Sequence, residues 1–339
     1  MTERQRNLKL SLSGWARAPW GGRKRLVVLA ALSLLLMISA SAWAYYLTTH
    51  RAISQVLSAG VPAVAAAVQP HYLFSINGVA EPYGVAVTSS GDRIYVVEGG
   101  GERLIRAFDR EGKALFAFAP PDTPVGGRRP VYVTVDETGL VYVVDRMRAA
   151  IDVYDAGGNY KTSIRSPLET GWLPLGVRAV GDHLLVTEVT KGKNRVLKLS
   201  KDGKLLSEFG REGQEKGELA YPNSVAEDAR GRIIVSDGNN ARVQVFDPSG
   251  AVLQVIYADF SLPRGIAVDG YQRLYVVDTI GQQVTVFDAR GDDVRQLFAF
   301  GDLGAGDGQF SYPNDIAIDD SDRLYISDRA NNRVQVWAY

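Results

Sequence analysis

The sequence predicts an all-β protein, a six-bladed β-propeller with four-stranded blades, on the basis of three observations. A proline-led apolar segment recurs six times, and successive leading prolines lie 48, 44, 48, 41 and 50 residues apart. Each leader is followed by two more short runs rich in Val, Ile, Tyr and Phe, bounded by Gly, Asp, Asn and Pro. No helical period of 3.6 residues accompanies them, and a period of this length is typical of propellers. The leading prolines are Pro82, Pro130, Pro174, Pro222, Pro263 and Pro313.

Each repeat is expected to supply four strands to the ring. The first strand begins at the leading proline, as in PYGVAV over 82–87. The third strand follows a turn, as in RVQVFD over 242–247, and a fourth follows a Gly or charged turn, as in KLLSEF over 204–209. The second strand ends in an acidic residue in every repeat, at Glu98, Asp145, Glu188, Asp237, Asp278 and Asp328.

The two ends of the repeat array predict how the ring closes. The last repeat stops after its third strand, whereas an unassigned strand, HYLFSI over 71–76, precedes the first repeat. This segment is similar to the fourth strands at 204–209 and 294–300, and like them it precedes a leading proline. We therefore expect it to complete the last blade and remove the open edges of a propeller domain that covers 71–339.

Two repeats carry a resemblance to a known family. RGRIIVSDGNNARVQVFD at 230–247 and SDRLYISDRANNRVQVW at 321–337 resemble NHL repeats, and the pattern covers nearly everything beyond residue 71. The resemblance implies a six-bladed propeller. It is less informative on function, because NHL propellers serve as extracellular sensor domains or as protein or RNA binders, and a related branch contains metal-dependent lyases.

A different kind of segment precedes the propeller. Residues 26–47 form a run of 22 without a charge, long enough to cross a bilayer as one helix. The preceding tail, 1–25, holds seven basic residues and one acidic residue, which predicts a cytoplasmic N-terminus. We expect a single-pass signal-anchor in the cytoplasmic membrane, a stalk over 48–70, and a propeller outside the cytoplasm, either periplasmic or extracellular.

A cleaved signal peptide is the alternative to an anchor. The small-residue pattern Ala42-Trp43-Ala44 after an apolar core is an acceptable cleavage site, in which case the propeller would be secreted. Trp43, Tyr45 and Tyr46 instead suit a membrane interface, and they favour the anchor. Both interpretations place the propeller outside the cytoplasm.

The charge distribution bears on the partner. The whole chain is balanced, but residues 51–339 hold 31 basic and 37 acidic residues, a formal charge of −6. Nucleic-acid binding needs an excess of basic residues, so no nucleic acid is expected as a partner. The chain has no cysteine, so no disulfide can stabilise the domain and no cysteine nucleophile is available.

Catalytic and metal sites find little support. The three histidines are His50, His71 and His183, whose positions along the repeats cannot converge on the axis, so a three-histidine zinc site is not expected. His183 is expected to be a solvated turn residue. The acidic residues that end the second strands, and those that end first strands at Asp136, Asp228, Asp269 and Asp319, are expected to cap turns. We predict no catalytic residue, no metal and no cofactor.

The candidate ligand-binding residues lie on one rim, where the links into the first strands and the turns between second and third strands share a face. This composition of aromatic residues, arginines and amides is typical of binding hot spots. The set consists of Tyr83, Tyr132, Arg148, Trp172, Asn223, Arg264 and Asn314. The predicted function is a noncatalytic binding or scaffold module for a protein, peptide or envelope polymer; the alternatives are a divalent-metal-dependent lyase or lactonase, and a purely structural role beside a membrane complex.

Overall fold

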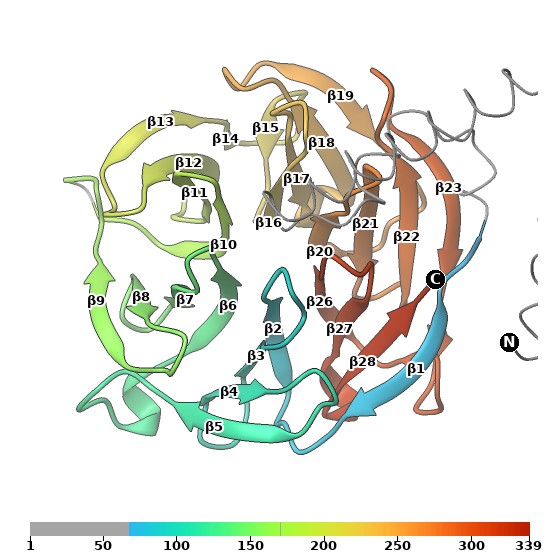
Figure 1. Cartoon of the computed structure of the whole chain (residues 1–339). Helices are drawn as coiled ribbons and strands as arrows, with labels where there is room; N and C mark the ends of the chain where they lie inside the picture. The colour runs from blue at the N-terminus through green and yellow to red at the C-terminus, as the bar shows by residue number, and fades with distance from the viewer. Residues whose placement is uncertain (1–67, 170) are drawn as a thin grey trace, which may run out of the picture. The chain divides into compact units, whose positions relative to one another are not determined.

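The computed structural model describes residues 68–169 and 171–339, and these residues contain six antiparallel sheets of four strands. The sheets are the blades of a propeller, arranged in chain order around a central axis (Figure 1). The all-β, six-bladed architecture expected from the repeat period is therefore confirmed.

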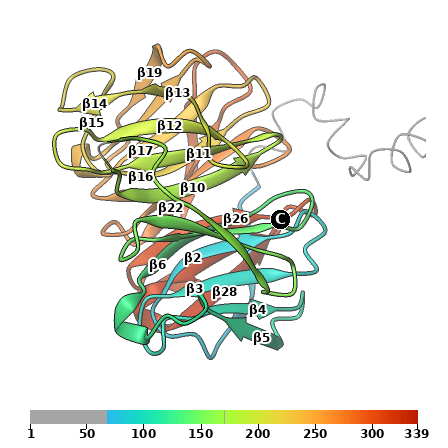
Figure 2. The ribbon, with the colours of Figure 1, turned by 90° about the vertical axis from the view of Figure 1, so that its left-hand side faces the viewer.

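The strands of blades 1 to 3 follow one another from the axis outward, as Figure 2 shows for blade 3. Blade 1 contains β2 (Pro82–Val87), β3 (Ile94–Glu98), β4 (Ile105–Phe108) and β5 (Ala114–Phe118). Blade 2 contains β6 (Pro130–Val135), β7 (Val141–Asp145), β8 (Ala150–Tyr154) and β9 (Tyr160–Ile164). Blade 3 contains β10 (Pro174–Val180), β11 (His183–Glu188), β12 (Arg195–Ser200) and β13 (Leu205–Phe209).

Blades 4 to 6 repeat this order, with one exception in the last blade. Blade 4 contains β16 (Pro222–Glu227), β17 (Ile233–Asp237), β18 (Arg242–Phe246) and β19 (Val252–Ile256). Blade 5 contains β20 (Pro263–Val268), β21 (Arg273–Asp278), β22 (Gln283–Asp288) and β23 (Arg295–Phe300). Blade 6 contains β26 (Pro313–Ile318), β27 (Leu324–Asp328), β28 (Arg333–Ala338) and, as its outer strand, β1 (His71–Ile76).

Short elements occupy the links and turns. Two small parallel pairs precede blades 4 and 6, formed by β14 (Arg211–Glu212) with β15 (Glu218–Leu219) and by β24 (Asp302–Leu303) with β25 (Gln309–Phe310). Single 3₁₀ turns lie at η2 (Val125–Gly127), η3 (Gly238–Asn240) and η4 (Arg329–Asn331). The pair formed by β24 and β25 lies in the glycine-rich link between blades 5 and 6.

The first strands surround the axis. β2 contacts β6 and β26, and the same contact between neighbouring first strands continues around the ring. In every blade the register with the second strand shifts just after the leading proline, as between Pro82 and Val85. Proline has no N–H to donate to a ladder, and a bulge changes the direction of the side chains beside it. The positions next to each proline therefore depart from the regular alternation of the strand.

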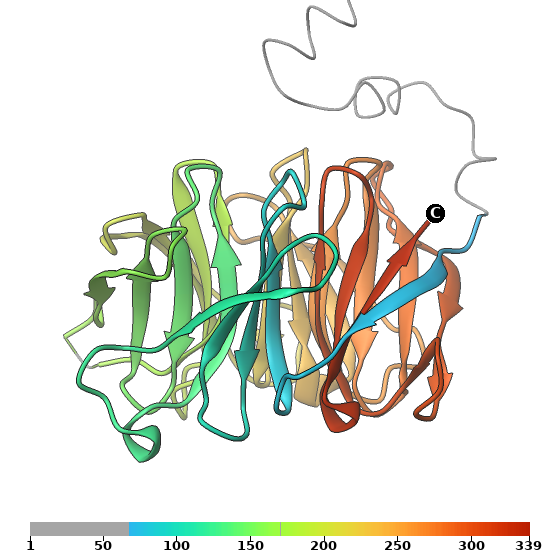
Figure 3. The same ribbon diagram turned by 60° about the horizontal axis from the view of Figure 1, so that its bottom comes forward.

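Ring closure follows the expected pattern. β1 pairs antiparallel with β28, with His71 opposite Ala338 and Ile76 opposite Val334, so the first and last strands of the propeller lie side by side (Figure 3). The rings of Tyr72 and Trp337 pack edge to face at 6.2 Å between centroids, which adds aromatic contact to the ladder. The prediction that 71–76 completes the last blade is confirmed.

The core lies between adjacent blades, where both faces of each sheet are covered. Three second strands carry a buried tyrosine whose hydroxyl donates to an aspartate just after the neighbouring first strand, which satisfies the only polar atom of the ring. The pairs are Tyr142 with Asp136 (3.1 Å), Tyr275 with Asp269 (2.9 Å) and Tyr325 with Asp319 (3.0 Å). These bonds fix the depth of the second strands in the core.

The predicted tail (1–25), the predicted anchor (26–47) and all but the last three residues of the predicted stalk (48–70) lie outside the described residues. Within 68–169 and 171–339, no helix has the length and apolar character needed to cross a bilayer.

A candidate ligand-binding rim

The face that holds the links into the first strands and the turns between second and third strands is called here the proline rim. Its outer part is a frame of acidic residues at the ends of the second strands. Glu98 accepts the backbone N–H of Ala80 at 3.0 Å, and Asp237 accepts that of Ala220 at 2.6 Å. Asp237 also pairs with Arg242, whose Nε lies 2.7 Å from Oδ2. All six acids accept backbone N–H groups, so the expectation that they bond backbone amides is confirmed.

Closer to the axis the balance of charge changes. The innermost rim positions are those on either side of each leading proline and the one that follows each second-strand acid. They include a single carboxylate, that of Glu81, and the four arginines Arg129, Arg146, Arg264 and Arg329. Within the described part of the chain, none of these arginines forms an ion pair with a carboxylate.

The aromatic residues of the rim partly cover these cations. The guanidinium of Arg329 lies 5.2 Å from the centre of the Tyr83 ring and 5.8 Å from that of Tyr312. The guanidinium of Arg146 lies 5.6 Å from the centre of the Tyr221 ring and also donates to the Tyr221 hydroxyl. Such cation–π contacts hold a guanidinium in place without neutralising its charge. The rim thus presents ordered cations beside aromatic rings.

A cavity of about 400 Å³ opens on this rim between blades 1 and 2. Glu81, Tyr83, Arg103, Arg129 and Met147 contribute to its walls, and the glycine run at 99–101 also lines it. A side chain at Gly99 would overlap the Tyr83 ring, so glycine is needed for that ring to lie where it does. No sequence motif indicated that this run lines a cavity.

A polar cluster lies at the axis, on the inner side of the rim. Arg264 donates from Nη1 to Oδ1 of Asn314 at 2.6 Å, and Asn314 donates from Nδ2 to the carbonyl oxygen of Tyr83 at 2.9 Å. Tyr132 is only 4% exposed, and its hydroxyl has no hydrogen-bond partner among the described residues. Burial raises the pKa of this hydroxyl, which therefore stays protonated.

Two charged residues extend the cluster along the axis. Arg178 of β10 reaches past blade 4 and donates to the carbonyl oxygen of Ile266 in β20 at 2.8 Å. Asp315 of β26 accepts the backbone N–H of Val85 at 3.1 Å. Burial raises the pKa of Asp315 to about 7, against the opposing charge of Arg178, and burial lowers the pKa of Arg178.

The predicted rim residues fall into two groups. Tyr83, Tyr132, Arg264 and Asn314 come together around the axis and the cavity, as described above. The others are engaged internally: Arg148 pairs with Asp152, Trp172 is 6% exposed and donates to the Ala149 carbonyl at 2.8 Å, and Asn223 donates to the Tyr221 carbonyl at 3.2 Å.

The aligned repeats contain a signal for Arg178 and Asp315, which the predicted rim set does not include. At the position of Arg178, four of the other first strands have alanine and one has threonine. At the position of Asp315, three have glycine, one has serine and one has Tyr132. Large polar side chains at positions that are otherwise small mark a departure from the fold's own needs.

His183 and the other side chains that could bind a metal ion do not form a metal site among the described residues. His183 is 6% exposed and lies with its two ring nitrogens 3.1 Å from carboxylate oxygens of Asp182 and Glu227. The expectation of a solvated turn residue was wrong, because the adjacent blade covers the ring. Among the side chains that the structure describes, no three His, Asp or Glu residues are grouped so that they could hold a metal ion.

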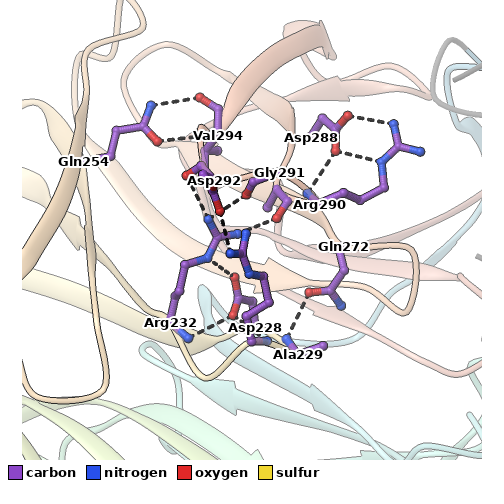
Figure 4. A network of polar contacts seen from close by, with 12 residues as sticks. Asp228, Ala229, Arg232, Gln254, Gln272, Asp288, Arg290, Gly291, Asp292 and Val294 are labelled. Carbon is purple, nitrogen blue, oxygen red and sulfur yellow. Dashed lines mark hydrogen bonds and ion pairs between the residues drawn. The ribbon is translucent and has the colours of Figure 1, made fainter. Parts of the chain in front are cut away.

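The opposite face, called here the turn rim, is fastened by a polar network (Figure 4). Asp228 accepts the backbone N–H of Arg230 and of Arg232, both at 2.9 Å, and pairs with the Arg232 Nε at 2.6 Å. The same guanidinium donates to carbonyl oxygens of the β22–β23 turn, including that of Gly291 at 2.9 Å. The turn-capping role expected for Asp228 is confirmed, and the network ties blade 4 to blade 5.

Comparison with known sequences agrees with this architecture. The NHL repeat model matches residues 219–246 and 310–337, which fall in blades 4 and 6. The chain is therefore a six-bladed β-propeller that carries NHL repeats. The expected resemblance of 230–247 and 321–337 to NHL repeats is confirmed within these two segments.

Curated relatives share parts of the propeller. The chain is 38% identical to human NHL repeat-containing protein 3 over 176 residues, which cover 48% of this chain and 51% of that protein. It is 41% identical to protein lin-41 of Caenorhabditis elegans over 63 residues, 19% of this chain and 5% of that protein. The chain thus spans about half, or much less, of the length of these relatives.

Solved structures with the same fold are distant in sequence. A streptogramin B lyase structure superposes with a TM-score of 0.58 at 14% identity, covering 80% of this chain and 98% of the lyase chain. Virginiamycin B lyase from Staphylococcus aureus gives 0.54 at 19% identity, with 80% and 88% covered. A nidogen/laminin complex gives 0.53 at 18%, with 65% and 79% covered. At these identities the likeness shows the fold alone.

Proposed function

We propose that the protein is a noncatalytic binding module whose proline rim holds an acidic segment of a protein partner. The observation that carries the proposal is the cavity between blades 1 and 2. Its lining holds two arginines without a carboxylate partner among the described residues, Arg103 and Arg129, against the one carboxylate of Glu81. A guanidinium offers a planar pair of donors that matches a carboxylate. Tyr83 and Met147 add the aromatic and apolar surface that a peptide backbone and side chain would cover.

The tether is a second part of the proposal. The uncharged run at 26–47 and the basic tail before it support a single-pass anchor with the propeller outside the cytoplasm. Proteolysis of intact cells or spheroplasts should then remove a C-terminal tag while leaving an N-terminal tag intact. The mass of the mature chain distinguishes an anchor from a cleaved signal, because cleavage near residue 44 would remove the whole tail and most of the run.

A protein ligand is favoured over a nucleic acid on charge and location. Residues 51–339 carry a formal charge of −6, and the cations that this proposal uses, which have no carboxylate partner among the described residues, are arginines of the proline rim. Nucleic acids require an extended basic face to replace phosphate counterions. A short acidic peptide needs only the local cations that the rim supplies.

The binding experiment uses full-length protein in detergent and a fluorescent peptide rich in glutamate. Replacement of Arg129 by Glu reverses a charge in the cavity, and we expect it to weaken peptide binding by at least about tenfold, the usual effect of losing a charge-assisted pair. Arg295→Glu is the matched control, since that exposed side chain lies on the outer strand β23. Equal binding by both variants, or equal binding of a lysine-rich peptide, would contradict the proposal.

Two further measurements on the full-length protein test the alternatives of a metal-dependent enzyme and of a nucleic-acid binder. A lyase or lactonase that uses a divalent ion should be stabilised against heat by calcium, magnesium or zinc, whereas the binding role requires no such effect. A single-stranded RNA of matched charge should not displace the acidic peptide. Displacement by RNA at low concentration would instead assign the rim to nucleic acid.

A further inference from the structure

The axial cluster contains one cation more than the carboxylates around it can balance. The opposite charges of Arg178 and Asp315 interact, and each acts on the pKa of the other. Arg264 has no such partner within the described residues: its Nη1 donates to the neutral amide of Asn314, and its Nε is buried without an acceptor. The Arg264 side chain is partly exposed, but its buried Nε donor lacks an acceptor, and a buried donor without an acceptor is costly.

A second donor lies in the same place. The Tyr132 hydroxyl is buried beside the Asn314 side chain, and its proton has no acceptor among the described residues. The nearby acceptors are already in use, because Asn314 Oδ1 binds Arg264 and the Tyr83 carbonyl binds Asn314. Arg264 Nε and the Tyr132 hydroxyl are therefore two donors without an acceptor on side chains that both adjoin Asn314.

The location of these donors limits what could bind. Arg264 and Tyr83 are partly exposed on the proline rim, whereas Tyr132, Asn314 and Asp315 are buried beneath them. A ligand would approach from the rim and would meet Arg264 first. Arg178 lies further along the first strands and donates from β10 to the Ile266 carbonyl of β20. Two donors without an acceptor and one cation without a carboxylate match a small group with two acceptor atoms and a single negative charge.

We propose that Arg264 and Tyr132 form an axial binding site for a carboxylate group. One carboxylate oxygen would accept from the Arg264 guanidinium and the other from the Tyr132 hydroxyl, which supplies an acceptor for both donors and balances the Arg264 charge. The carboxylate can come from a free monoanion such as formate or acetate, or from a side chain of a larger ligand on the rim. This site is separate from the cavity between blades 1 and 2.

The test measures heat stability of the full-length protein in sodium formate against sodium sulfate at fixed ionic strength. Wild type should gain stability with formate in a saturable manner. Tyr132→Phe removes only the hydroxyl, and Arg264→Gln removes the charge; each should raise the half-saturating formate concentration by at least about tenfold. Tyr160→Phe, on the outer strand β9, is the control and should respond as wild type does.

Stability without a carboxylate provides an independent readout. Because the Tyr132 hydroxyl has no partner in the described structure, Tyr132→Phe should be at least as stable as wild type in sulfate and less stable than wild type in formate. A variant that is at least as stable as wild type in sulfate but less stable in formate has lost ligand binding, not a structural contact. Wild type that shows no saturable response to formate, or variants that respond as wild type does, would overturn the proposal.

Competition identifies the source of the carboxylate. If formate displaces the glutamate-rich peptide, and Tyr132→Phe weakens that peptide, the site takes a side chain of the partner. If the peptide binds unchanged in saturating formate while the melts still respond, the site takes a free monoanion. Both results support a carboxylate site, and neither depends on the Arg129 cavity.

Discussion

The two rims of the propeller use arginine in opposite ways. On the turn rim, Arg232 pairs with the buried carboxylate of Asp228 and spends its other donors on carbonyl oxygens of the next blade. On the inner proline rim, Arg264 and Arg329 contact only an amide, a hydroxyl and aromatic rings within the described residues. The turn rim therefore uses the guanidinium of Arg232 to join two blades, whereas the inner proline rim leaves the guanidinium groups of Arg264 and Arg329 without a carboxylate partner among the described residues.

The largest expected effect comes from breaking the turn-rim network. Arg232→Ala leaves the Asp228 carboxylate buried and without its cation, and it removes the link to the Gly291 carbonyl. Removing one partner of a buried pair costs about 3–5 kcal/mol in the free energy of unfolding. Denaturant unfolding of the full chain measures it.

An exposed pair on the same rim is the control for that change. Arg290 pairs with Asp288 at 2.7 Å, but both side chains are partly exposed. Exposed pairs contribute no more than about 1 kcal/mol, so Arg290→Ala should have little effect. If both alanine variants lose equal stability, the turn rim is not fastened by its buried arginine.

A somewhat smaller effect is expected at the axis, and it depends on pH. The folded-state pKa of Asp315, about 7, exceeds its ordinary value of 3.8, so the unfolded chain releases this proton at lower pH than the folded protein. The contribution of Asp315 to stability is therefore fully present below about pH 4 and is lost as pH rises to about 7. Asp315→Asn should remove this loss, on the order of 2–4 kcal/mol.

The measurement compares unfolding of the two proteins from pH 4 to pH 8. The neutral asparagine can still accept from the Val85 N–H, so this hydrogen bond is kept, but the side chain no longer titrates. The stability of wild type should fall relative to the variant across this window and then run parallel above it. Curves that stay parallel throughout would show that folding does not raise the pKa of Asp315.

The smallest expected effect on stability lies at the cavity of the proline rim. Gly99→Ala places a methyl group where the Tyr83 ring lies, and because the ring is the far end of a side chain it can shift, at a cost of about 1 kcal/mol. Peptide binding should fall several-fold, since the shifted ring narrows the cavity. The fluorescence binding assay measures it.

A neighbouring glycine provides the matched control. Nothing lies within 4 Å of a Cβ added at Gly126, in the exposed turn η2, so Gly126→Ala should change neither stability nor binding. Binding that is unaffected by Gly99→Ala would show that the cavity does not hold the ligand, and the contrast between the two rims would then lose its functional meaning.

Local pattern was sufficient for most of the fold. Each first strand begins at its leading proline, each second strand ends at its acidic residue, and β1 occupies the expected range of 71–76. These features depend on neighbours in sequence: missing proline N–H groups, acidic side chains near backbone amides, and period-two alternation. The membrane anchor and the identity of the ligand stay predictions.

The site was harder to predict because it depends on distant neighbours. Whether an arginine is free depends on which acid the fold brings beside it: Arg148 meets Asp152, whereas Arg264 meets an amide from another blade. Trp172 looked like a surface anchor, but the ring packs into the core between blades 2 and 3. Arg178 of blade 3 donates to a carbonyl oxygen in blade 5, and a local sequence pattern cannot indicate a contact between such distant segments.

The pairing of β1 with β28 also sets the timing of folding during synthesis. Among the described strands β1 is made first and β28 last, so the outer strand of blade 6 must wait until more than 250 later residues have been added. Until then the first and sixth blades cannot close the circle, and cooperative stability arrives only with the final strand. Contacts so distant in sequence form slowly, so an unfinished chain passes through a long interval in which unpaired strand edges are exposed and must be protected.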